Sequence, residues 1–404
     1  MAVADRDLIR AINRFNILNT IRNAGLISRV EISEMTGQSR ATVTNITAEL
    51  VRKNLIFEKE LRNSKTRGRK RILLTLNPDA AYVVGTKISD LQISFVVTNM
   101  MADILSSLII PVRTSERPVE FIADLIEEGI RHCVNDARLN LEMISGIGIG
   151  VPGFVDSASG ICYWSALYKK GDVPLQKLVY DRLSIPTFIE NDANAVTLAE
   201  QWFGEGKGIN NFLVVTVEHG IGMGIVVNGQ LYRGAQGIAA EFGHMVVRPG
   251  GNTCRCGKRG CIEAYASDIS IMQAAKDSFE KGEWIHDDLS KLSIDELTIL
   301  AKKKELALKK IFEEAGSVLG LGIAGLIQMF NPSKIIVCGE GVRASDLLFE
   351  PMRKAIYEHT NKEMTERLDI VIQKWKDTDW ARGAASLVLQ ELFKSPFNRV
   401  RPVI

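Results

Sequence analysis

Three cysteines and one histidine form the densest group of metal-binding side chains in the sequence. Cys254, Cys256 and Cys261 fall within eight residues, and His244 lies ten residues before the first of them. Three thiolates and one imidazole complete the tetrahedral shell of a structural zinc ion and leave no open coordination position. Glycines near the cysteines suit a loop that turns sharply around an ion. We therefore expect a structural zinc site at these four residues.

Other interpretations of the same residues do without a metal. The thiols could be unrelated core cysteines, or a disulfide with one spare thiol, and His244 could be a core histidine. We favour the metal because free cysteines rarely gather in a loop rich in glycine and arginine. Glu241 and Glu263 flank this metal knot, so a fixed knot would hold both carboxylates beside a polar pocket. The alternative for both is a solvated loop charge.

The composition is that of a globular protein with several domains. The chain has 404 residues, of which 46% are hydrophobic and 24% charged, enough for two or three domains with sizeable cores. We expect no transmembrane helix, because no uninterrupted run of about 18 apolar residues occurs, and no signal peptide. Six scattered cysteines fit a reducing cytoplasm.

The charge is concentrated at the N-terminus. Residues 1–77 contain 15 Lys and Arg against 7 Asp and Glu, a net charge of +8, so the remainder must carry −6 to give the total of +2. A basic module on an acidic body predicts a polyanionic partner for that module only.

Helical periodicity and capping signals divide this module into three helices. The first covers about residues 7–23, with an inward stripe that includes Leu18 and Ile21. The second opens at the capping box Ser28-x-x-Glu31, with Ile32 and Met35 as its buried stripe. After a turn at Gly37, Ser39 caps a third helix that reaches about residue 53, with Val43, Ile46 and Leu50 facing inward. This spacing is typical of a helix-turn-helix.

The third helix presents short hydrogen-bonding side chains and one arginine at its start, suited to base edges and phosphates. Two strands, near 55–59 and 71–76, would then form a wing with a basic tip that contacts the DNA backbone or minor groove. The predicted DNA-binding residues are Gln38, Ser39, Arg40, Thr42, Thr44 and Asn45 on the helix and Arg67, Arg69 and Lys70 on the wing. The alternative is a three-helix protein-interaction module with a solvated basic loop.

After the domain boundary at 77–79, the chain alternates between strands and helices. Expected strands lie at 82–88, 92–98, 146–151, 187–190, 211–217 and 335–339, and expected helices at 116–135, 193–203 and within a helical zone at 268–329. We place the glycines of 220–224 in the turn after the fifth of these strands. The strands and helices form two successive α/β series, each with turns at the strand ends that could bind a ligand. This predicts a two-lobed body with a cleft between the lobes.

The body resembles the ROK family, which groups bacterial repressors, uncharacterised frames and sugar kinases. The motifs that carry the resemblance are Gly150-Val151-Pro152-Gly153, Glu190-Asn191-Asp192-Ala193-Asn194-Ala195, Leu231-Tyr232-Arg233-Gly234-Ala235, Glu241-Phe242-Gly243-His244 and the cysteine stretch from Cys254 to Glu263. With the helix-turn-helix in front, the whole chain resembles the xylose-repressor and N-acetylglucosamine-repressor branch. This implies an actin-like sugar-kinase fold of the hexokinase type and zinc on the four ligands named above.

The resemblance also implies a sugar site. It carries over onto Gly153, Asn191, Asp192, Glu241, His244 and Glu263. Carboxylates and amides suit sugar hydroxyls, and a histidine can bind zinc with one ring nitrogen and the sugar with the other. Helix capping is the alternative role for Asn191 and Asp192, and it is compatible with ligand contact.

The resemblance fails where the family's kinases hold ATP. Their first turn carries Asp-x-Gly-Gly-Thr, and the matching stretch here is Lys87-Ile88-Ser89-Asp90-Leu91. Their second phosphate turn is half kept and begins with Glu218, which would repel phosphate. We therefore expect no kinase reaction and no catalytic residue, although Asp192 matches the kinases' base. Ala166 also stands where the kinases usually place an Asn that holds a sugar hydroxyl. Alanine cannot make that contact, so the resemblance does not specify which sugar binds.

These observations predict a winged helix-turn-helix domain over residues 1–77 and a two-lobed α/β body. The first lobe would cover 78–200 and be completed by a helix near 381–395, and the second would cover 201–380. The leading interpretation is a cytoplasmic repressor of sugar-utilisation genes that binds palindromic operator DNA as a homodimer or tetramer. A sugar in the cleft would control it by binding two states unequally. The alternatives are a sugar kinase with a DNA-binding appendage, or a repressor sequestered by a protein partner.

Overall fold

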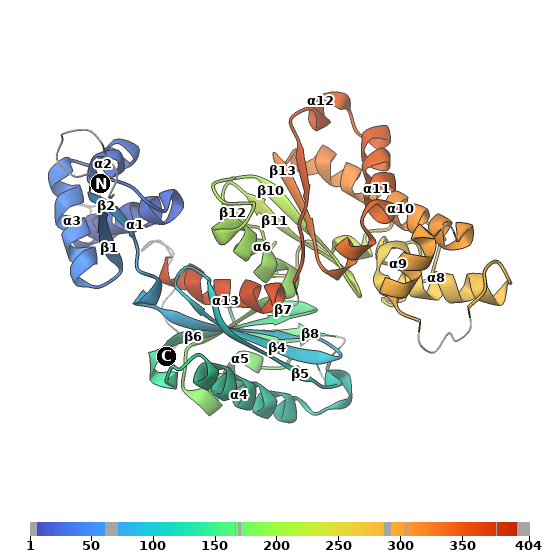
Figure 1. The fold of residues 1–404 in the computed structure, drawn as a ribbon, viewed down its shortest axis with the longest axis horizontal. Helices are drawn as coiled ribbons and strands as arrows, with labels where there is room; N and C mark the ends of the chain where they lie inside the picture. Colours follow the sequence, from blue (N-terminus) through green and yellow to red (C-terminus); the bar gives the residue numbers. More distant parts are fainter. Residues whose placement is uncertain are drawn as a thin grey trace. The chain divides into compact units, whose positions relative to one another are not determined.

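The computed structural model describes residues 6–60, 72–165, 167–168, 171–286, 292–303, 305–376 and 378–393 (Figure 1). The chain divides into two compact units. The first comprises Met1–Asp192 and Trp380–Ile404, and the second comprises Ala193–Asp379. The proposed domain limits at 77/78 and 200/201 stay predictions.

The N-terminal part of the first unit is a three-helix module followed by a two-stranded wing. Its helices are α1 (Arg6–Ala24), α2 (Arg29–Thr36) and α3 (Arg40–Arg52), and its antiparallel strands are β1 (Ile56–Glu60) and β2 (Ile72–Leu76). The predicted capping box closes the start of α2, because Ser28 accepts from the Glu31 amide while the Glu31 side chain accepts from the Ser28 amide. Gly37 ends that helix at φ 67°, in the left-handed region where glycine is favoured.

The predicted inward face of this module is confirmed in part. Ile32, Val43 and Leu50 are fully buried. The prediction for Met35 was wrong, since its side chain is 68% exposed. The eight-residue α2 buries Ile32 alone, and Met35 lies in its last turn on the solvent side.

The rest of the first unit is a five-stranded mixed sheet in the order β5-β4-β3-β6-β9. β3, β4 and β5 form an antiparallel meander, whereas β6 and β9 run parallel to β3. The strands are β3 (Tyr82–Ile88), β4 (Gln92–Asn99), β5 (Ile104–Pro111), β6 (Ile144–Val151) and β9 (Thr187–Asn191), with a separate hairpin of β7 (Phe154–Asp156) and β8 (Ile161–Trp164). The helices are α4 (Val119–Asp136), α5 (Leu175–Leu183) and α13 (Asp379–Leu392).

Helix α13 joins this unit from the far end of the sequence and packs closely on the sheet (Figure 1). Two strand glycines permit the contact. A Cβ on Gly85 would lie 1.9 Å from the Ala381 carbonyl oxygen, and one on Gly148 would lie 1.9 Å from that of Ala384. Because backbone atoms cannot rotate away, any side chain at either position would push the helix off the sheet.

The second unit repeats the same arrangement with a sheet in the order β12-β11-β10-β13-β14. β10, β11 and β12 are antiparallel neighbours, and β13 and β14 run parallel to β10. The strands are β10 (Phe212–Val217), β11 (Ile221–Val227), β12 (Gln230–Leu231), β13 (Lys334–Cys338) and β14 (Asp369–Ile372). The helices are α6 (Asp192–Phe203), α7 (Glu263–Ala266), α8 (Asp268–Glu280), α9 (Ile294–Lys302), α10 (Leu306–Phe330), α11 (Asp346–His359) and α12 (Lys362–Thr365).

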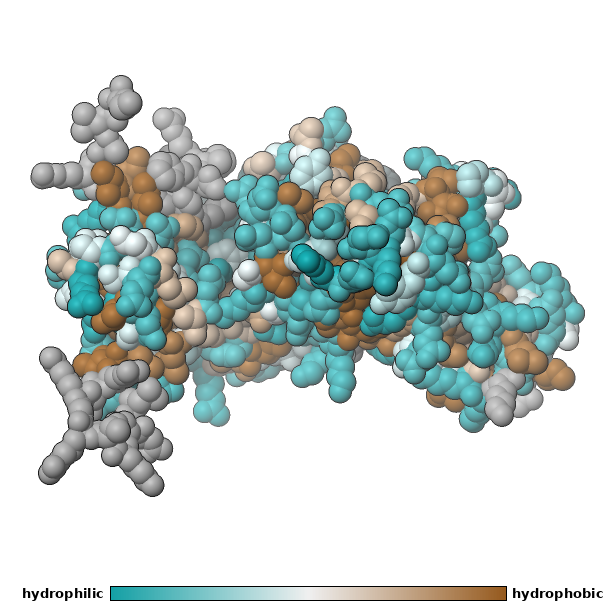
Figure 2. Space-filling model, turned by 90° about the horizontal axis from the view of Figure 1, so that it is seen from above, coloured by the Kyte–Doolittle hydropathy of each residue, from teal (hydrophilic) through white to brown (hydrophobic). Residues whose placement is uncertain are grey.

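Helix α10 is the central helix of this unit. It is long and apolar enough to cross a membrane, and 61% of its most apolar window is buried inside the protein. Gly316 and Gly320 bring it against α11, since Cβ atoms there would lie 2.2 Å from the Leu348 oxygen and 2.3 Å from the Met352 oxygen. These contacts are those of a core helix. On the face drawn in Figure 2, hydrophilic side chains predominate and hydrophobic ones are scattered among them.

Two local predictions were wrong. The helix expected from residue 116 begins at Val119, because Pro118 precedes it as the N-cap. The glycines of 220–224 do not all lie in a turn, because β11 already begins at Ile221. Gly224 instead makes room for α6, where a Cβ would lie 2.0 Å from the Thr197 hydroxyl oxygen. The predicted fold class is confirmed: a winged helix-turn-helix precedes two α/β lobes of the actin-like type.

Candidate functional site

The start of α3 presents a polar surface. Ser39, Arg40, Thr44 and Asn45 are exposed, whereas Gln38 and Thr42 are half-buried. Arg40 and Asn45 lie in the first two turns of the helix, where positive charge and amide groups suit phosphates and bases. The predicted wing residues Arg67, Arg69 and Lys70 lie outside the described residues.

Several of these polar groups also have local roles. Ser39 caps α3 by accepting from the Thr42 amide at 3.1 Å, and the Thr44 hydroxyl donates to the Arg40 carbonyl at 2.8 Å. The Gln38 amide donates to the Asn13 carbonyl of α1 at 3.4 Å. Of the four exposed side chains, Arg40 and Asn45 are the longer two, and they carry a guanidinium and an amide group.

The structure brings the four predicted metal ligands together. One ligand atom each from His244, Cys254, Cys256 and Cys261 lies within 4.8 Å of all the others. His244 ends the short 3-10 helix η4 (Phe242–His244), and Cys261 lies two residues before α7. Bridges between Val246 and Cys261 and between Thr253 and Arg259 close the intervening loop. Gly260 at φ 85° permits its return, since a Cβ would lie 1.8 Å from the Arg248 oxygen.

Two distances between these atoms match those expected around a tetrahedral zinc ion. Zn–S bonds of about 2.3 Å and Zn–N bonds of about 2.0–2.1 Å place neighbouring sulfurs about 3.8 Å apart and sulfur and nitrogen about 3.6 Å apart. The Cys256 and Cys261 sulfurs are 3.8 Å apart, and the Cys254 sulfur lies 3.6 Å from His244 Nδ1. Burial raises the pKa of Cys254 above that of an ordinary thiol. A bound cation would supply the charge that lets this thiol ionise.

The Glu263 carboxylate links the metal loop to the turn between β10 and β11, through an ion pair with Arg255 and a hydrogen bond from a backbone amide. The Glu263 carboxylate accepts from Arg255 Nε at 2.7 Å and Nη2 at 3.2 Å, and from the Ile221 amide at 3.3 Å. Gly220 permits this approach, because its Cβ would lie 2.6 Å from the Arg255 guanidinium. The Cys254 sulfur lies 3.8 Å from the same carboxylate. The knot and the turn therefore share one carboxylate.

In the first unit, three of the predicted sugar-site residues lie together. The Asn191 side-chain amide donates to the Gly153 carbonyl at 3.1 Å, and Asp192 follows directly at the start of α6. Gly153 adopts φ 121°, and its Cβ would lie 2.2 Å from the Trp164 oxygen, so glycine is required where the chain enters β7 beside the end of β8.

In the second unit, the other three predicted residues are the metal ligand His244 and two glutamates, Glu241 and Glu263, close to the metal ligands. The Glu241 carbonyl accepts from the His244 amide at 3.1 Å, and Glu263 adjoins Cys254 as described above. The interpretation as solvated loop charge was wrong for Glu263, which is 4% exposed. Glu241 is exposed.

Sequence reasoning missed a buried ion pair in the first unit. Lys87 is 4% exposed at the end of β3, and its ammonium pairs with the Asp192 carboxylate. The same ammonium lies 4.2 Å from the ring centroid of Trp380 on α13. The signal was a lysine inside the apolar stretch of residues 82–88, but its partners come from positions far along the chain.

A second buried acid, Asp268 at the start of α8, lies beside the carboxyl end of β10. The Glu218 carbonyl accepts from the Asp268 amide at 3.0 Å. Burial raises the pKa of Asp268 to about 6, with His219 and Arg343 opposing the shift and Glu340 and Asp295 adding to it. A buried acid therefore lies beside the turn that follows β10.

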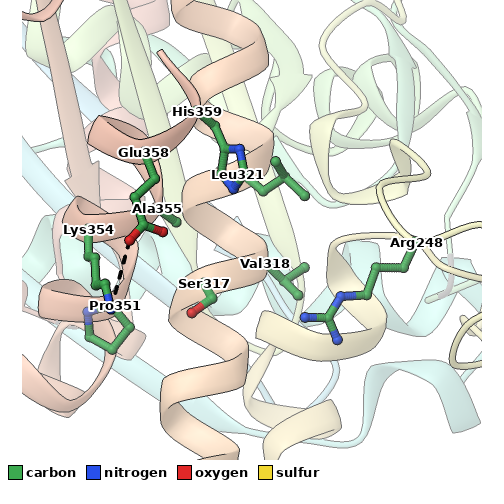
Figure 3. Close-up of a pocket in the computed structure, with 9 residues that line it drawn as sticks. All are labelled: Arg248, Ser317, Val318, Leu321, Pro351, Lys354, Ala355, Glu358 and His359. Carbon is green, nitrogen blue, oxygen red and sulfur yellow. Dashed lines mark ion pairs between the residues drawn. The ribbon is translucent and has the colours of Figure 1, made fainter. Parts of the chain in front are cut away.

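A shallow pocket lies between α10 and α11 (Figure 3). Its volume is about 180 Å³, below the roughly 300–1,000 Å³ typical of small-molecule sites. The nine residues in Figure 3 include Lys354 and Glu358, which form an ion pair at 3.8 Å on α11. This pocket is a surface depression between packed helices, apart from the predicted ligands.

Comparison with known proteins places both parts of the chain. The ROK family profile matches residues 85–391, and a winged helix-turn-helix DNA-binding profile matches residues 10–56. A protein named putative xylose repressor from Caldicellulosiruptor sp. (strain Rt8B.4) is 32% identical over 396 residues, covering 96% of this chain and 98% of the relative.

Solved structures agree with this placement. A ROK family transcriptional regulator, described as a homologue of the E. coli MLC protein, matches with a TM-score of 0.81 at 26% identity and covers 96% of this chain and 97% of its own. A ROK family glucokinase from Streptomyces griseus, solved with glucose and AMPPNP, matches with a TM-score of 0.68 at 27% identity and covers 77% of this chain and 100% of its own. The chain belongs to the ROK family and carries an N-terminal winged helix-turn-helix DNA-binding module.

Proposed function

We propose that this protein is a cytoplasmic transcriptional repressor of sugar-utilisation genes, controlled by a sugar or sugar derivative. The observation that carries the proposal is the similarity to a protein named putative xylose repressor, which extends over 96% of this chain. Because the relative's name specifies xylose, D-xylose is the first effector to test. The ROK body, which follows the DNA-binding module along the chain, supports the same conclusion.

The proposed operator interface is the start of α3 and the wing. Arg40 and Asn45 read base edges in the major groove, and Ser39, Thr42 and Thr44 contact phosphates, with Gln38 at the edge. Arg67, Arg69 and Lys70 on the wing contact the backbone or minor groove. A homodimer places two such modules on the half-sites of a palindrome, and two dimers can pair into a tetramer.

The proposed effector site comprises Gly153, Asn191, Asp192, Glu241, His244 and Glu263. Carboxylates and amides provide acceptors and donors for several hydroxyls at once. The metal knot is the proposed structural zinc site, with His244, Cys254, Cys256 and Cys261 as ligands. Since the shell has no open position, zinc supplies rigidity and no catalytic step.

Two features support a sensor that is not a kinase. Lys87 stands where the family's kinases have a metal-anchoring Asp, and it pairs with Asp192, the residue that matches their base. Glu218 begins the second phosphate turn, and its carbonyl accepts a hydrogen bond from the backbone amide of the buried residue Asp268. The first change replaces the carboxylate that would anchor the metal ion with a lysine, and the second places a negative charge where ATP phosphates would bind.

The test of the DNA interface is Arg40→Ala, measured on an operator duplex selected from a random DNA pool with the wild-type protein. Loss of a bidentate base contact costs about 1–3 kcal/mol, so we expect affinity to fall by roughly 5- to 150-fold and specificity to relax. Arg52→Ala is the matched control, because it removes the same charge at the opposite end of α3. Equal effects of the two variants would contradict the assignment of the recognition surface.

A further inference from the structure

The Lys87–Asp192 pair is an unusual feature for the interior of a sheet. All residues of β3 after Tyr82 are buried, Lys87 among them. A buried ammonium is costly unless a charge and other polar or aromatic groups compensate it. Here Asp192 provides the charge, and the face of Trp380 provides a cation–π contact at 4.2 Å.

The backbone at Asp192 is also held in place. A Cβ on Gly150 of β6 would lie at an ordinary van der Waals distance of 3.7 Å from both Asp192 Cα and Cβ, so β6 runs beside this residue. The preceding Asn191 is tied to the Gly153 carbonyl at 3.1 Å. The ammonium contacts Oδ2 of this carboxylate. The lysine therefore holds the Asp192 carboxylate in a defined direction.

We propose that Lys87 is a positioning residue for effector recognition: it orients the Asp192 carboxylate so that this group accepts a hydrogen bond from a sugar hydroxyl. The inference rests on the proposed sugar-sensing function. Lys87 acts through Asp192 and does not itself contact the sugar. It supplies a fixed positive charge within the protein, so the site is organised without a nucleotide or its metal ion.

A double-mutant cycle tests this inference by calorimetry with D-xylose, D-glucose and N-acetylglucosamine as probes. The variants are Lys87→Met, Asp192→Asn and the double variant. Disrupting a hydrogen bond to a charged group lowers binding affinity by about 10- to 100-fold. We expect each single variant to show that loss of sugar affinity. The double variant should bind no more weakly than Asp192→Asn alone, since the lysine acts through the carboxylate.

Lys177→Met is the matched control, because Lys177 forms an exposed ion pair with Asp181 on α5 in the same unit. It should leave sugar affinity unchanged. Lys87→Gln keeps a hydrogen-bond donor and should retain more affinity than Lys87→Met. It replaces Lys87→Met in the cycle if that variant does not fold, as judged by circular dichroism.

The outcomes separate this inference from the function on which it rests. Suppose that the wild-type protein binds a sugar. If the Lys87 variants then bind it with unchanged affinity, or if the losses of affinity in the cycle are fully additive, the positioning role is overturned and the sensing function remains intact. A wild-type protein that binds operator DNA but none of the three sugars overturns the proposed sugar control, and the inference with it.

Discussion

Replacing Cys256 with serine tests the role of the metal knot with little disturbance to packing. Cys256 is the exposed cysteine of the cluster, whereas Cys254 and Cys261 are buried. The change exchanges one sulfur for oxygen at the surface, so the loss of a metal ligand dominates its effect. A buried cysteine would instead combine metal loss with a packing defect.

The expected magnitude follows from linkage between metal binding and folding. Zinc present at a thousand times its dissociation constant adds about 4.1 kcal/mol to the native state. In a unit of roughly 150–250 residues, 1 kcal/mol shifts the unfolding temperature by about 2–4 °C. We therefore expect Cys256→Ser to lower the unfolding temperature of the second unit by roughly 8–16 °C. Chelation of the wild-type metal should produce the same decrease.

The knot also supports groups outside the metal shell. Glu263 contacts both Cys254 and the Ile221 amide, so metal loss should loosen the turn between β10 and β11. Hydrogen exchange at the Ile221 amide reports this directly. Lys258→Ala is the control, since Lys258 is an exposed residue of the same loop that is not among the four candidate ligands.

The assay is metal analysis together with thermal unfolding in buffered zinc and in a chelator. Wild-type protein should contain about one zinc per chain, as a complete shell requires, and Cys256→Ser should contain almost none. A wild-type protein purified gently without metal, with an unfolding temperature that chelators do not change, would refute the reasoning.

Two further predictions concern stability. Hydrogen bonds from Arg10 and Lys53 lower the pKa of Glu49 from 4.5 to about 2, so its contribution is complete above about pH 5 and is lost as the pH falls from there towards 2. Because Arg10 is exposed, we expect Glu49→Gln to cost only about 1–2 kcal/mol at pH 7, and a difference in unfolding temperature that did not narrow by pH 3.5 would contradict the assignment. Gly148→Ala should destabilise by about 3 kcal/mol or more, because its Cβ would collide with the Ala384 oxygen. Gly325→Ala, with open space around it on α10, should instead stabilise by about 0.4–1 kcal/mol in denaturant titrations, and equal effects of the two alanines would refute the packing argument.

Features with local causes could be predicted from the sequence. The capping box at Ser28 and the cap at Ser39 set the starts of α2 and α3 through contacts within three residues. The cysteine spacing brought four ligands together because a short loop can close around them. Periodic apolar runs placed most buried strands, since a strand buried on both faces needs them.

Features that depend on distant partners could not be predicted. The edge strand β5 alternates between exposed and half-buried residues, so it lacks a continuous apolar run. Gly224 looked like a turn residue, but its cause is contact with Thr197 of α6. The pairing of Lys87 with Asp192 spans 105 residues, and no local pattern records it.

The measurement that tests the central claim most directly is operator affinity with and without sugar. The protein would be titrated against the selected duplex by fluorescence anisotropy, at fixed salt, with D-xylose and the other sugars added singly and without ATP. Allosteric coupling of about 1–3 kcal/mol corresponds to 5- to 150-fold, and the account predicts a change in that range with one sugar. Operator affinity that no sugar alters, or sugar-dependent release of ADP when ATP and magnesium are supplied, would contradict a sugar-sensing repressor without kinase activity.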